Sequence, residues 1–263
     1  MKKRLDLLLV EKGLFESRHQ ASSAILAGDV LVNGQKLTKA GMAFDINSTI
    51  EVVKKPKYVS RGGQKLEKAL GDFDIEVQDK IALDIGASTG GFTDVLLQQE
   101  AKKVIAIDVG YGQFSYKLRN NPHVELFERT NIRDFKPGDL QELADIAVVD
   151  LSFISVLKVI DNIVQLLKPE ADLVILIKPQ FEAGKGVVGK GGVVRDKNVH
   201  LEVLTRIADN LEKGLQIKGL IFSPIRGPKG NIEFFYHLTK TNKRVVSYCR
   251  KKIKQVVESS HEC

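Results

Sequence analysis

The sequence has little cysteine. Only two of its 263 residues are cysteines, and both lie near the carboxyl end, at Cys249 and Cys263. Cysteines in these places exclude a disulfide framework and a metal site built on cysteine spacing. The usage is typical of a reducing compartment, so we expect a cytoplasmic protein that binds no metal.

Long apolar runs are also missing. No stretch approaches the roughly 20 apolar residues that cross a bilayer. The basic amino-terminal segment MKKRLDLLLVEKG contains an apolar run that is too short for a signal peptide. We therefore expect a soluble protein inside the cell, without stable membrane insertion.

Basic residues outnumber acidic ones. The chain has 40 Lys and Arg against 33 Asp and Glu, which gives a formal net charge of +7. A basic surface favours polyanionic partners such as nucleic acid, although a charge of this size can also serve solubility alone.

The first 53 residues predict a small α+β domain. A helix over Arg18–Ala27 is its clearest element, because Ser17 can cap the start and Gly28 can end it. The Asn-Gly pair in VLVNGQKL predicts a hairpin, and a further strand follows at 49–53. Residues 54–62, which include the basic segment KKPK, are interpreted as a linker.

From residue 63 onward, short apolar strands alternate with helices, which predicts a mostly parallel sheet with helices on both faces. The expected strands are 81–86, 103–109, 124–128, 146–151, 173–178, 219–224 and 232–238, and the expected helices include 92–100, 156–167 and 198–213.

A short turn rich in glycine and proline joins the last two of these strands, so we expect them to pair antiparallel. Five parallel strands closed by a hairpin are typical of class I, Rossmann-like methyltransferases that use S-adenosylmethionine. We place this α/β domain at 63–240 and a basic helix and tail at 241–263.

The segment LDIGASTGGFTDVL joins the first strand to its helix through glycines. A tight turn of this kind occurs in many α/β proteins, but two acids make it more specific. Asp84 precedes the first glycine, where a carboxylate can bind a cationic amino-acid ligand, and Asp108 ends the next strand, where an acid can bind ribose hydroxyls. The run GASTGG lacks the full glycine pattern of a pyrophosphate site, so we predict S-adenosylmethionine.

Residues of the turn and of the next two strand ends are the candidate cofactor ligands. Two of them, in RTNIRDF, are candidates for the adenine edge. The set is Asp84, Gly86, Ala87, Ser88, Thr89, Gly90, Gly91, Phe92, Asp108, Asn131 and Ile132.

A second glycine-rich segment, GKGVVGKGG at 184–192, is similar to a phosphate-binding loop. Gly191 stands where such a loop needs Ser or Thr for magnesium, and no strand ends directly before Gly184. We interpret the segment as a lid that contacts substrate phosphates.

Charged residues stand at the ends of two strands that otherwise look buried. Asp150 follows IAVV and Lys178 follows LVILI, while Glu233 begins the last strand and Lys65 lies in the helix that enters the domain. Each of them singly could be a surface charge. Because the carboxyl ends of parallel strands meet at one edge, we expect the four side chains at a single crevice beside the cofactor turn.

In order and in local context, these four residues resemble the K-D-K-E tetrad of the FtsJ-like ribose 2′-O-methyltransferases. The segments YVSRGGQKL, LDIGASTGGFTD, VVDLSFIS, LIKPQFEAGKG and GNIEFF are similar to the TlyA family of bacterial rRNA methyltransferases, also labelled hemolysin A. The resemblance covers essentially the whole chain, and Thr89 departs from the proline of the wider FtsJ pattern. It implies ribose 2′-O-methylation of a cytidine in 23S rRNA, with 16S rRNA as a second target.

A ribose hydroxyl is a poor nucleophile, so methyl transfer to it needs a general base. We predict Lys178 as that base and Asp150 as the residue that orients it. Lys65 would stabilise the developing alkoxide, and Glu233 would position Lys65 or the ribose. No metal is required.

The segments RLDLLLVEKG and SRHQASSAILAGDVLVNG resemble the S4 RNA-binding domain, although FDINST differs from the usual Gly-Asp before its last strand. The basic carboxyl-terminal segment predicts an amphipathic helix that docks on the sheet and turns its basic face to RNA, or else lies on a membrane surface. The candidate contacts to RNA phosphates are Arg4, Arg18, Lys36, Arg61, Lys185 and Lys190.

Two other functions remain open from the sequence. One is a membrane-active cytolysin, as the name hemolysin A suggests, and the other is a non-catalytic factor that binds ribosomes and assists their assembly. For the enzyme, the expected partners are ribosomal RNA or ribosomal subunits. The oligomeric state is not indicated.

Overall fold

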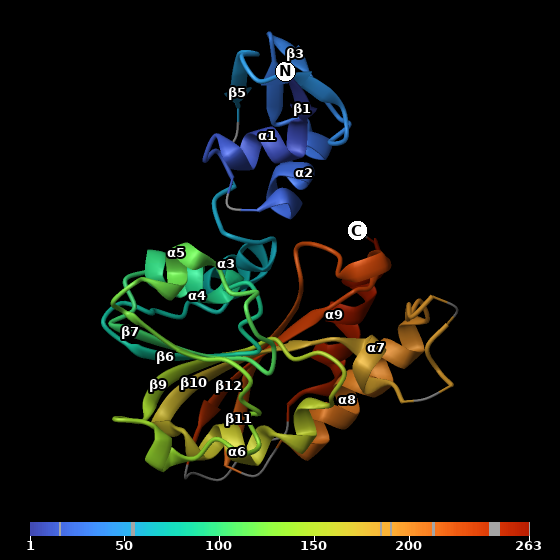
Figure 1. Cartoon of the computed structure of the whole chain (residues 1–263). Helices are drawn as coiled ribbons and strands as arrows, with labels where there is room; N and C mark the ends of the chain where they lie inside the picture. The colour runs from blue at the N-terminus through green and yellow to red at the C-terminus, as the bar shows by residue number, and fades with distance from the viewer. Residues whose placement is uncertain are drawn as a thin grey trace. The chain divides into compact units, whose positions relative to one another are not determined.

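The computed structural model describes residues 1–15, 17–53, 56–184, 186–189, 191–211, 214–241 and 248–262. The chain divides into two compact units, Met1–Ser60 and Arg61–Cys263 (Figure 1). The division falls inside the segment 54–62 that the sequence analysis interpreted as a linker.

The first unit is a small α+β domain. Two helices, α1 (Leu5–Glu11) and α2 (Arg18–Ala27), pack on short strands. The strands form a three-stranded sheet in the order β3-β2-β5 and a separate pair β1-β4. Their bounds are Lys2–Arg4 for β1, Val30–Val32 for β2, Gln35–Lys36 for β3, Ala43–Asp45 for β4 and Ile50–Val52 for β5.

Local signals in the sequence set the clearest elements of this unit. The Ser17 side chain accepts a hydrogen bond from the Gln20 amide, and Gly28 ends α2 in the left-handed conformation at φ 76°. The predicted hairpin is confirmed by the antiparallel pairing of β2 with β3. The pair β1-β4 was not predicted, because it joins residues 39 to 43 positions apart and no local turn in the sequence indicates such a pairing.

The second unit contains the predicted seven-stranded sheet, in the order β11-β12-β10-β9-β6-β7-β8. Its first five strands in the chain run parallel, and β12 pairs antiparallel with both β10 and β11. This confirms the expected closing hairpin. The bounds are Ile81–Ile85 for β6, Lys103–Ile107 for β7, Val124–Phe127 for β8, Ala144–Val149 for β9, Leu167–Ile177 for β10, Leu215–Phe222 for β11 and Phe234–Lys240 for β12.

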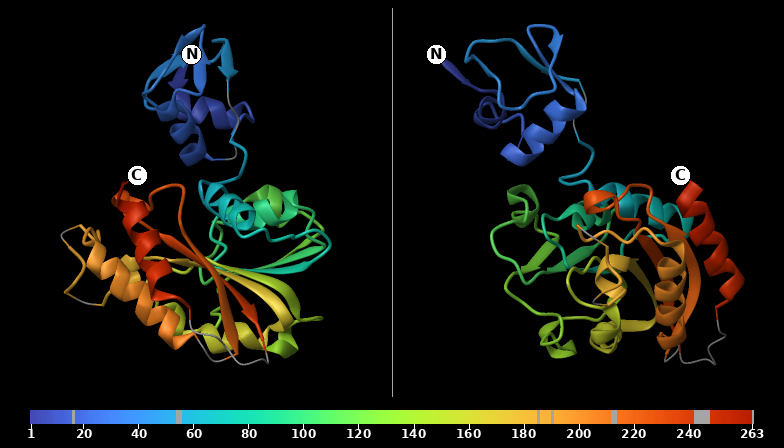
Figure 2. Two further views of the ribbon diagram at one scale, coloured as in Figure 1. Left: turned by 180° about the vertical axis from the view of Figure 1, so that it is seen from behind. Right: turned by 90° about the vertical axis from the view of Figure 1, so that its right-hand side faces the viewer.

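Helices cover both faces of this sheet (Figures 1 and 2). On one face lie α3 (Gly62–Asp72), α4 (Gly91–Gln98) and α5 (Tyr116–Arg119), and on the other lie α6 (Ile160–Gln165) and α8 (Lys197–Asn210). A single turn, α7 (Pro179–Glu182), follows β10 directly. Three short 3-10 turns complete the unit: η1 (Pro137–Asp139), η2 (Val156–Lys158) and η3 (Pro228–Gly230).

One predicted helix is wrong in its extent. The sequence analysis expected a helix over 156–167, whereas the structure has η2, then α6, and starts β10 already at Leu167. Leu167 pairs instead with Ala144 of β9, so the chain is already extended two residues before Pro169. The strand then shifts its register between Leu167 and Asp172 before the regular pairing with β9 begins.

The carboxyl-terminal helix α9 (Arg250–Glu262) is shorter than the basic segment predicted at 241–263. Its apolar residues Ile253 and Val257 are buried in the core of this unit. Residues 242–247, which hold part of the expected apolar stripe, lie outside the described residues. The basic side chains at the start of α9 are exposed, as an amphipathic helix requires.

A buried histidine of α8, His200, contacts an exposed histidine of α9, His261. Nδ1 of His200 lies 2.9 Å from Nε2 of His261, and the His200 ring also packs against Phe234. Burial lowers the pKa of His200 to about 4, with the charge of His261 and that of Arg226 acting in the same direction and Asp196 opposing them. The neutral imidazole is therefore the form that fits the folded unit.

The stability of this unit should consequently fall in acid. Folding lowers the pKa of His200, so its contribution to stability is complete when the pH is above 6.5, the pKa in the unfolded chain. This contribution is lost as the pH falls from 6.5 through 4. We expect His200 to add a slope of up to about 1.4 kcal/mol per pH unit to the free energy of opening. Hydrogen exchange of the β12 amides between pH 7 and pH 4.5 measures that free energy in the wild type and in His200→Leu. Equal slopes in the two proteins would contradict the assignment.

Candidate active site

The parallel strands of the second unit all end, at their carboxyl ends, on one edge of the sheet. The Asp150 amide, just after β9, donates to the Ile85 carbonyl at the end of β6, and the Gly86 amide donates to the Ile107 carbonyl at the end of β7. These backbone bonds hold the chain segments that leave β6, β7 and β9 next to one another. Ligands of open α/β sheets bind at such an edge.

The turn between β6 and α4 needs glycine at two positions. Gly86 has φ 85°, and a Cβ atom there would lie 2.4 Å from the carbonyl oxygen of Asp150. Gly90, at φ 91°, precedes α4, and a Cβ atom there would come within 2.5 Å of the Leu118 side chain. Neither position can carry a side chain without strain or a shift of its neighbours. The backbone of the turn is therefore held close to the edge where a ligand would lie.

Asp108 follows β7 and fixes this turn from the side. Its carboxylate accepts hydrogen bonds from the backbone amides of Ser88 and Gly110, at 2.8 and 2.6 Å, and from the Gln113 side chain at 3.2 Å. A carboxylate has room for about four hydrogen bonds, so a further donor can still be accepted. Binding of ribose hydroxyls by Asp108 stays a prediction, with these contacts holding the carboxylate in place.

Asp84 is the most unusual charged residue of the edge. Its side chain is fully buried in β6, and Oδ2 accepts a hydrogen bond of 2.6 Å from the Thr93 hydroxyl. The other oxygen, Oδ1, has no partner among the described residues. Burial raises the pKa of Asp84 to about 7; the charges of Asp150 and Asp108 act in the same direction, and the hydrogen bond from Thr93 opposes them.

An orphaned buried oxygen is costly unless a ligand satisfies it. A ligand with a cationic amino group would both bond to Oδ1 of Asp84 and stabilise its charged form. The turn beside it has the close backbone approach that a nucleoside needs. The residues therefore fit the predicted cofactor, S-adenosylmethionine.

The structure places the other predicted cofactor ligands in different surroundings. The Phe92 ring packs against Phe235 in the core, so Phe92 offers mainly its backbone to the edge. The Ile132 side chain is buried in the core as well. The Asn131 side chain accepts a hydrogen bond from the Arg133 amide. Ala87 is buried, while Ser88 and Thr89 are exposed and Gly91 starts α4. Their contacts with a cofactor stay predictions.

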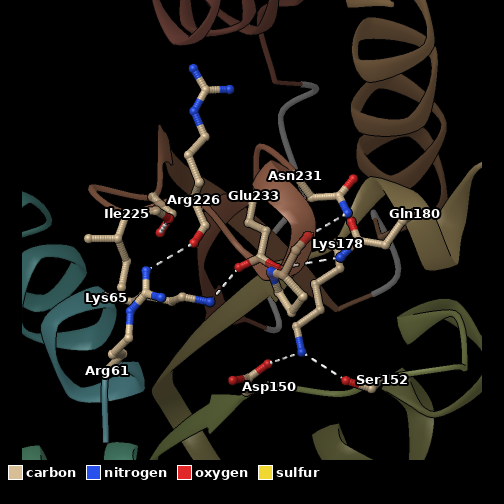
Figure 3. A network of polar contacts seen from close by, with 12 residues as sticks. Arg61, Lys65, Asp150, Ser152, Lys178, Gln180, Ile225, Arg226, Asn231 and Glu233 are labelled. Atoms are coloured by element: carbon tan, nitrogen blue, oxygen red, sulfur yellow. Dashed lines mark hydrogen bonds and ion pairs between the residues drawn. The ribbon is translucent and has the colours of Figure 1, made fainter. Parts of the chain in front are cut away.

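The four residues of the predicted tetrad lie as two ion pairs (Figure 3). Nζ of Lys178 lies 2.6 Å from Oδ1 of Asp150, and Nζ of Lys65 lies 2.5 Å from Oε2 of Glu233. The structure thus joins β9 to β10 by one pair and α3 to the start of β12 by the other. All four side chains are at least three-quarters buried, with exposures of 12% for Lys178, 23% for Asp150, 10% for Lys65 and 0% for Glu233.

Neighbouring side chains add further contacts to both pairs. The Lys178 amine donates a hydrogen bond of 2.9 Å to the Ser152 hydroxyl, and the Gln180 amide donates one of 3.4 Å to Oε1 of Glu233. The backbone of Gly227 lies so close to Glu233 that a Cβ atom there would come within 2.0 Å of Oε1. The turn between β11 and β12 therefore fixes the direction of the Glu233 carboxylate.

Sequence reasoning missed Ser152 and Gln180 as members of this site. Each stands two residues beyond a predicted tetrad residue, in VVDLSF and LIKPQF. Their closeness in sequence to Asp150 and Lys178 was the only signal. Neither residue is charged, and an uncharged polar residue shortly after a strand does not by itself indicate a site. Only the fold of the loop after β9 and of the helical turn α7 brings them to the ion pairs.

The predicted RNA contacts are not all free cations. In the first unit, the guanidinium groups of Arg4 and Arg18 both bind the buried carboxylate of Asp6, at 3.0 and 2.9 Å. Arg4 first and Arg18 with it hold the pKa of Asp6 well below its usual range. Both arginine side chains remain about half exposed, so phosphate contacts from their outer nitrogens are still a prediction.

The other four predicted RNA contacts, Lys36, Arg61, Lys185 and Lys190, lie in different surroundings or outside the described residues. The Lys36 side chain lies against Gly28, where a Cβ atom would meet its Cε atom. In the second unit, Arg61 donates to the Arg226 carbonyl at 3.5 Å. Lys185 and Lys190 lie outside the described residues.

Two family models match the chain. Residues 58–240 match the FtsJ-like methyltransferase model, and residues 3–50 match the S4 domain model. The first match covers more than half of the sequence and contains the glycine turn and both ion pairs.

Similar proteins cover nearly the whole chain. A protein from Bacillus subtilis described as "Putative rRNA methyltransferase YqxC" is 50% identical over 90% of this chain and 85% of its own length. The 16S/23S rRNA (cytidine-2′-O)-methyltransferase TlyA of Mycobacterium tuberculosis is 43% identical, with 93% and 92% covered. A solved structure described as "Putative hemolysin from Streptococcus thermophilus" is 43% identical with a TM-score of 0.80, over 99% of this chain and 96% of that one.

The charge of Asp84 should control cofactor binding. Since burial raises the pKa of this residue to about 7, its carboxylate carries a full charge only at higher pH. We expect the affinity for S-adenosylmethionine to rise between pH 6 and 7.5, and Asp84→Asn to lose about tenfold in affinity, or about 1.4 kcal/mol. Isothermal titration calorimetry at several pH values measures both effects.

Titration of the ligand itself is common to both proteins, so the difference between them isolates Asp84. The same pH dependence in wild type and Asp84→Asn would show that this carboxylate does not receive the ligand cation.

Proposed function

The chain belongs to the FtsJ-like methyltransferase family, and we propose that it transfers a methyl group to a ribose 2′-hydroxyl of ribosomal RNA. S-adenosylmethionine is the methyl donor. When bound, it supplies an electrophilic methyl group on a sulfonium. Asp84, the backbone of Gly86 to Gly91, and Asp108 are the residues that would hold it.

One observation carries this proposal: the Lys178 amine, paired with the Asp150 carboxylate, lies directly beside the glycine turn. The carbonyl oxygen of Asp150 packs on Gly86, so the residue that pairs with Lys178 touches the backbone of the cofactor turn. A hydroxyl placed at this edge therefore meets an amine on one side and the donor on the other. This is the arrangement that O-methylation needs, since proton removal must accompany attack on the methyl carbon.

The two pairs differ in what they can do. Lys178 ends a central strand and keeps 12% of its side chain exposed, so it can reach a substrate hydroxyl and act as the general base. Asp150 orients its amine. Lys65, held by the fully buried Glu233, is the cation that stabilises the developing alkoxide. Removal of Glu233 would leave that lysine without its partner, which is costly at a buried site.

An aromatic group beside the base supports a nucleotide as the substrate. Phe153 is 88% exposed, has a positive φ of 64°, and lies with its ring centroid 4.6 Å from that of Phe181. A large apolar ring held in strained backbone at a reaction site suits stacking of an unpaired base. Such stacking is typically worth about 1 to 3 kcal/mol per base.

Ribosomal RNA is the substrate that the rest of the chain favours. The S4 domain model matches residues 3–50, and the net charge is +7. The relative from Mycobacterium tuberculosis is named for cytidine 2′-O-methylation of 16S and 23S rRNA. By this similarity we propose a cytidine of 23S rRNA, with 16S rRNA as a further target, and a place of action in the cytoplasm with the ribosomes.

A cytolytic function is the second candidate, because the similar structure from Streptococcus thermophilus is described as a hemolysin. Across the described residues, no helix is long and apolar enough to cross a membrane. The apolar face of α9, which could lie on a bilayer, is instead buried against the sheet through Ile253 and Val257. The geometry therefore favours the methyltransferase.

Replacement of Lys178 should abolish methyl transfer. We expect Lys178→Ala and Lys178→Arg to lose at least about 100-fold in kcat, because neither side chain can take the hydroxyl proton at neutral pH. Transfer of tritiated methyl groups from S-adenosylmethionine to ribosomal subunits that lack the modification measures the rate. Lys103→Ala is the matched control, since Lys103 is the first residue of β7, at the end of the strand away from the candidate site, and pairs with Glu125.

Wild-type rates in Lys178→Ala would rule out the lysine as the base. Tight binding of subunits by the wild type without any methyl incorporation would instead identify a non-catalytic assembly factor. Lysis of liposomes by Lys178→Ala would revive the cytolysin.

A further inference from the structure

The Lys178 amine has a second oxygen partner besides Asp150, the hydroxyl of Ser152 (Figure 3). We propose that Ser152 is a positioning residue that turns the amine of Lys178 toward the substrate hydroxyl. This inference rests on the proposed function, because it assigns a role within the same reaction. Ser152 lies outside the Lys-Asp-Lys-Glu set and adds a fifth side chain to it.

The two oxygens hold the amine in different ways. Oδ1 of Asp150 lies 2.6 Å from Nζ, yet it makes no hydrogen bond of acceptable angle with any described residue. The contact with Oγ of Ser152, at 2.9 Å, does meet hydrogen-bond geometry. A charge-charge attraction depends on distance and hardly on angle, whereas a hydrogen bond is directional. Asp150 and Ser152 therefore hold the amine together, and the hydrogen bond to Ser152 adds the directional contact that selects its rotation.

Rotation matters because a base must present its lone pair. The nitrogen of a neutral lysine has four tetrahedral positions: the bond to Cε, two N–H bonds and one lone pair. One N–H is donated to Ser152 and the amine is held beside the Asp150 carboxylate, which leaves the second N–H and the lone pair. In the part of the chain that the structure describes, no third hydrogen-bond or ion-pair partner occupies these positions. The lone pair is thus open to the proton of an incoming hydroxyl.

The loop that carries Ser152 is fixed at both of its ends. At its start, the Asp150 amide donates to the Ile85 carbonyl, and the Asp150 carbonyl packs on Gly86. At its far end, the Val156 amide donates a hydrogen bond of 2.8 Å to Oε1 of Glu182, whose side chain is 4% exposed. Glu182 belongs to α7, the turn that begins directly after Lys178.

Glu182 is itself held by Arg206 of α8, which donates to the Glu182 carbonyl at 2.6 Å and lies 3.5 Å from its carboxylate. Consequently the hydroxyl of Ser152 and the amine of Lys178 are attached to one cross-linked framework. A pair fixed in this way is prepared before the substrate arrives, which is where a positioning contact lowers the barrier. A serine on a free loop could not do this.

The experiment compares steady-state kinetics of the full-length wild type, Ser152→Ala, Ser152→Thr and Ser155→Ala, with S-adenosylmethionine and unmodified ribosomal subunits. We expect Ser152→Ala to lower kcat about tenfold and to leave KM for both substrates within about twofold, because the hydroxyl acts on the base and not on binding. Ser152→Thr keeps the hydroxyl and should recover most of kcat.

Ser155→Ala is the matched control. Its hydroxyl lies in the same loop but accepts a hydrogen bond from the Leu157 amide and does not contact Lys178. We expect its kinetics to match the wild type.

The inference is overturned if kcat of Ser152→Ala equals that of the wild type. It is also overturned if Ser152→Thr is as slow as Ser152→Ala, or if the loss appears in KM alone. In each of these cases an active wild type leaves the proposed function standing. A wild type that transfers no methyl group to ribosomal RNA overturns the proposed function itself, and this inference falls with it.

Discussion

The packing of the Asp150 carbonyl on Gly86 is the contact on which the rest of the site depends. It brings the end of β9 against the glycine turn so closely that a single methyl group could not fit between them. Through this contact the carboxylate of Asp150, its partner Lys178 and the cofactor turn become one unit. Burial of charges costs free energy unless each is paired, and the site meets that cost with two ion pairs and additional hydrogen bonds.

The charges of this edge also bias one another. Burial and the two neighbouring carboxylates raise the pKa of Asp84 to about 7, so a bound cation would stabilise its charged form. The second pair, Lys65 with Glu233, comes from α3 and from the residue before β12, elements that are far apart in sequence. Gln180, two residues after Lys178, donates a hydrogen bond to Glu233 and so links this pair to the segment that carries the base. In the proposed reaction, the first pair supplies the base and the second supplies the cation that stabilises the alkoxide.

Much of this arrangement was predictable, for identifiable reasons. Charged residues at the ends of apolar strands, Asp150 and Lys178, could be assigned to one edge because parallel strands all end there. Gly86 and Gly90 were predictable since a strand-turn-helix segment needs them. Ser152 could not be found, because its contact depends on how a loop folds back and no periodicity reports that. The early start of β10 could not be predicted for a similar reason. The segment around Pro169 pairs with β9 in an irregular register, so its apolar and polar residues do not alternate as in a regular strand.

The central claim is that these paired charges beside the donor modify a ribose in ribosomal RNA. Mapping 2′-O-methylated nucleotides in ribosomal RNA tests it most directly, using cells that lack the gene and carry either the wild type or Lys65→Ala on a plasmid. We expect a methylated cytidine in 23S rRNA that is present with the wild type and absent with Lys65→Ala. An identical methylation map in the deleted and the complemented cells would contradict it.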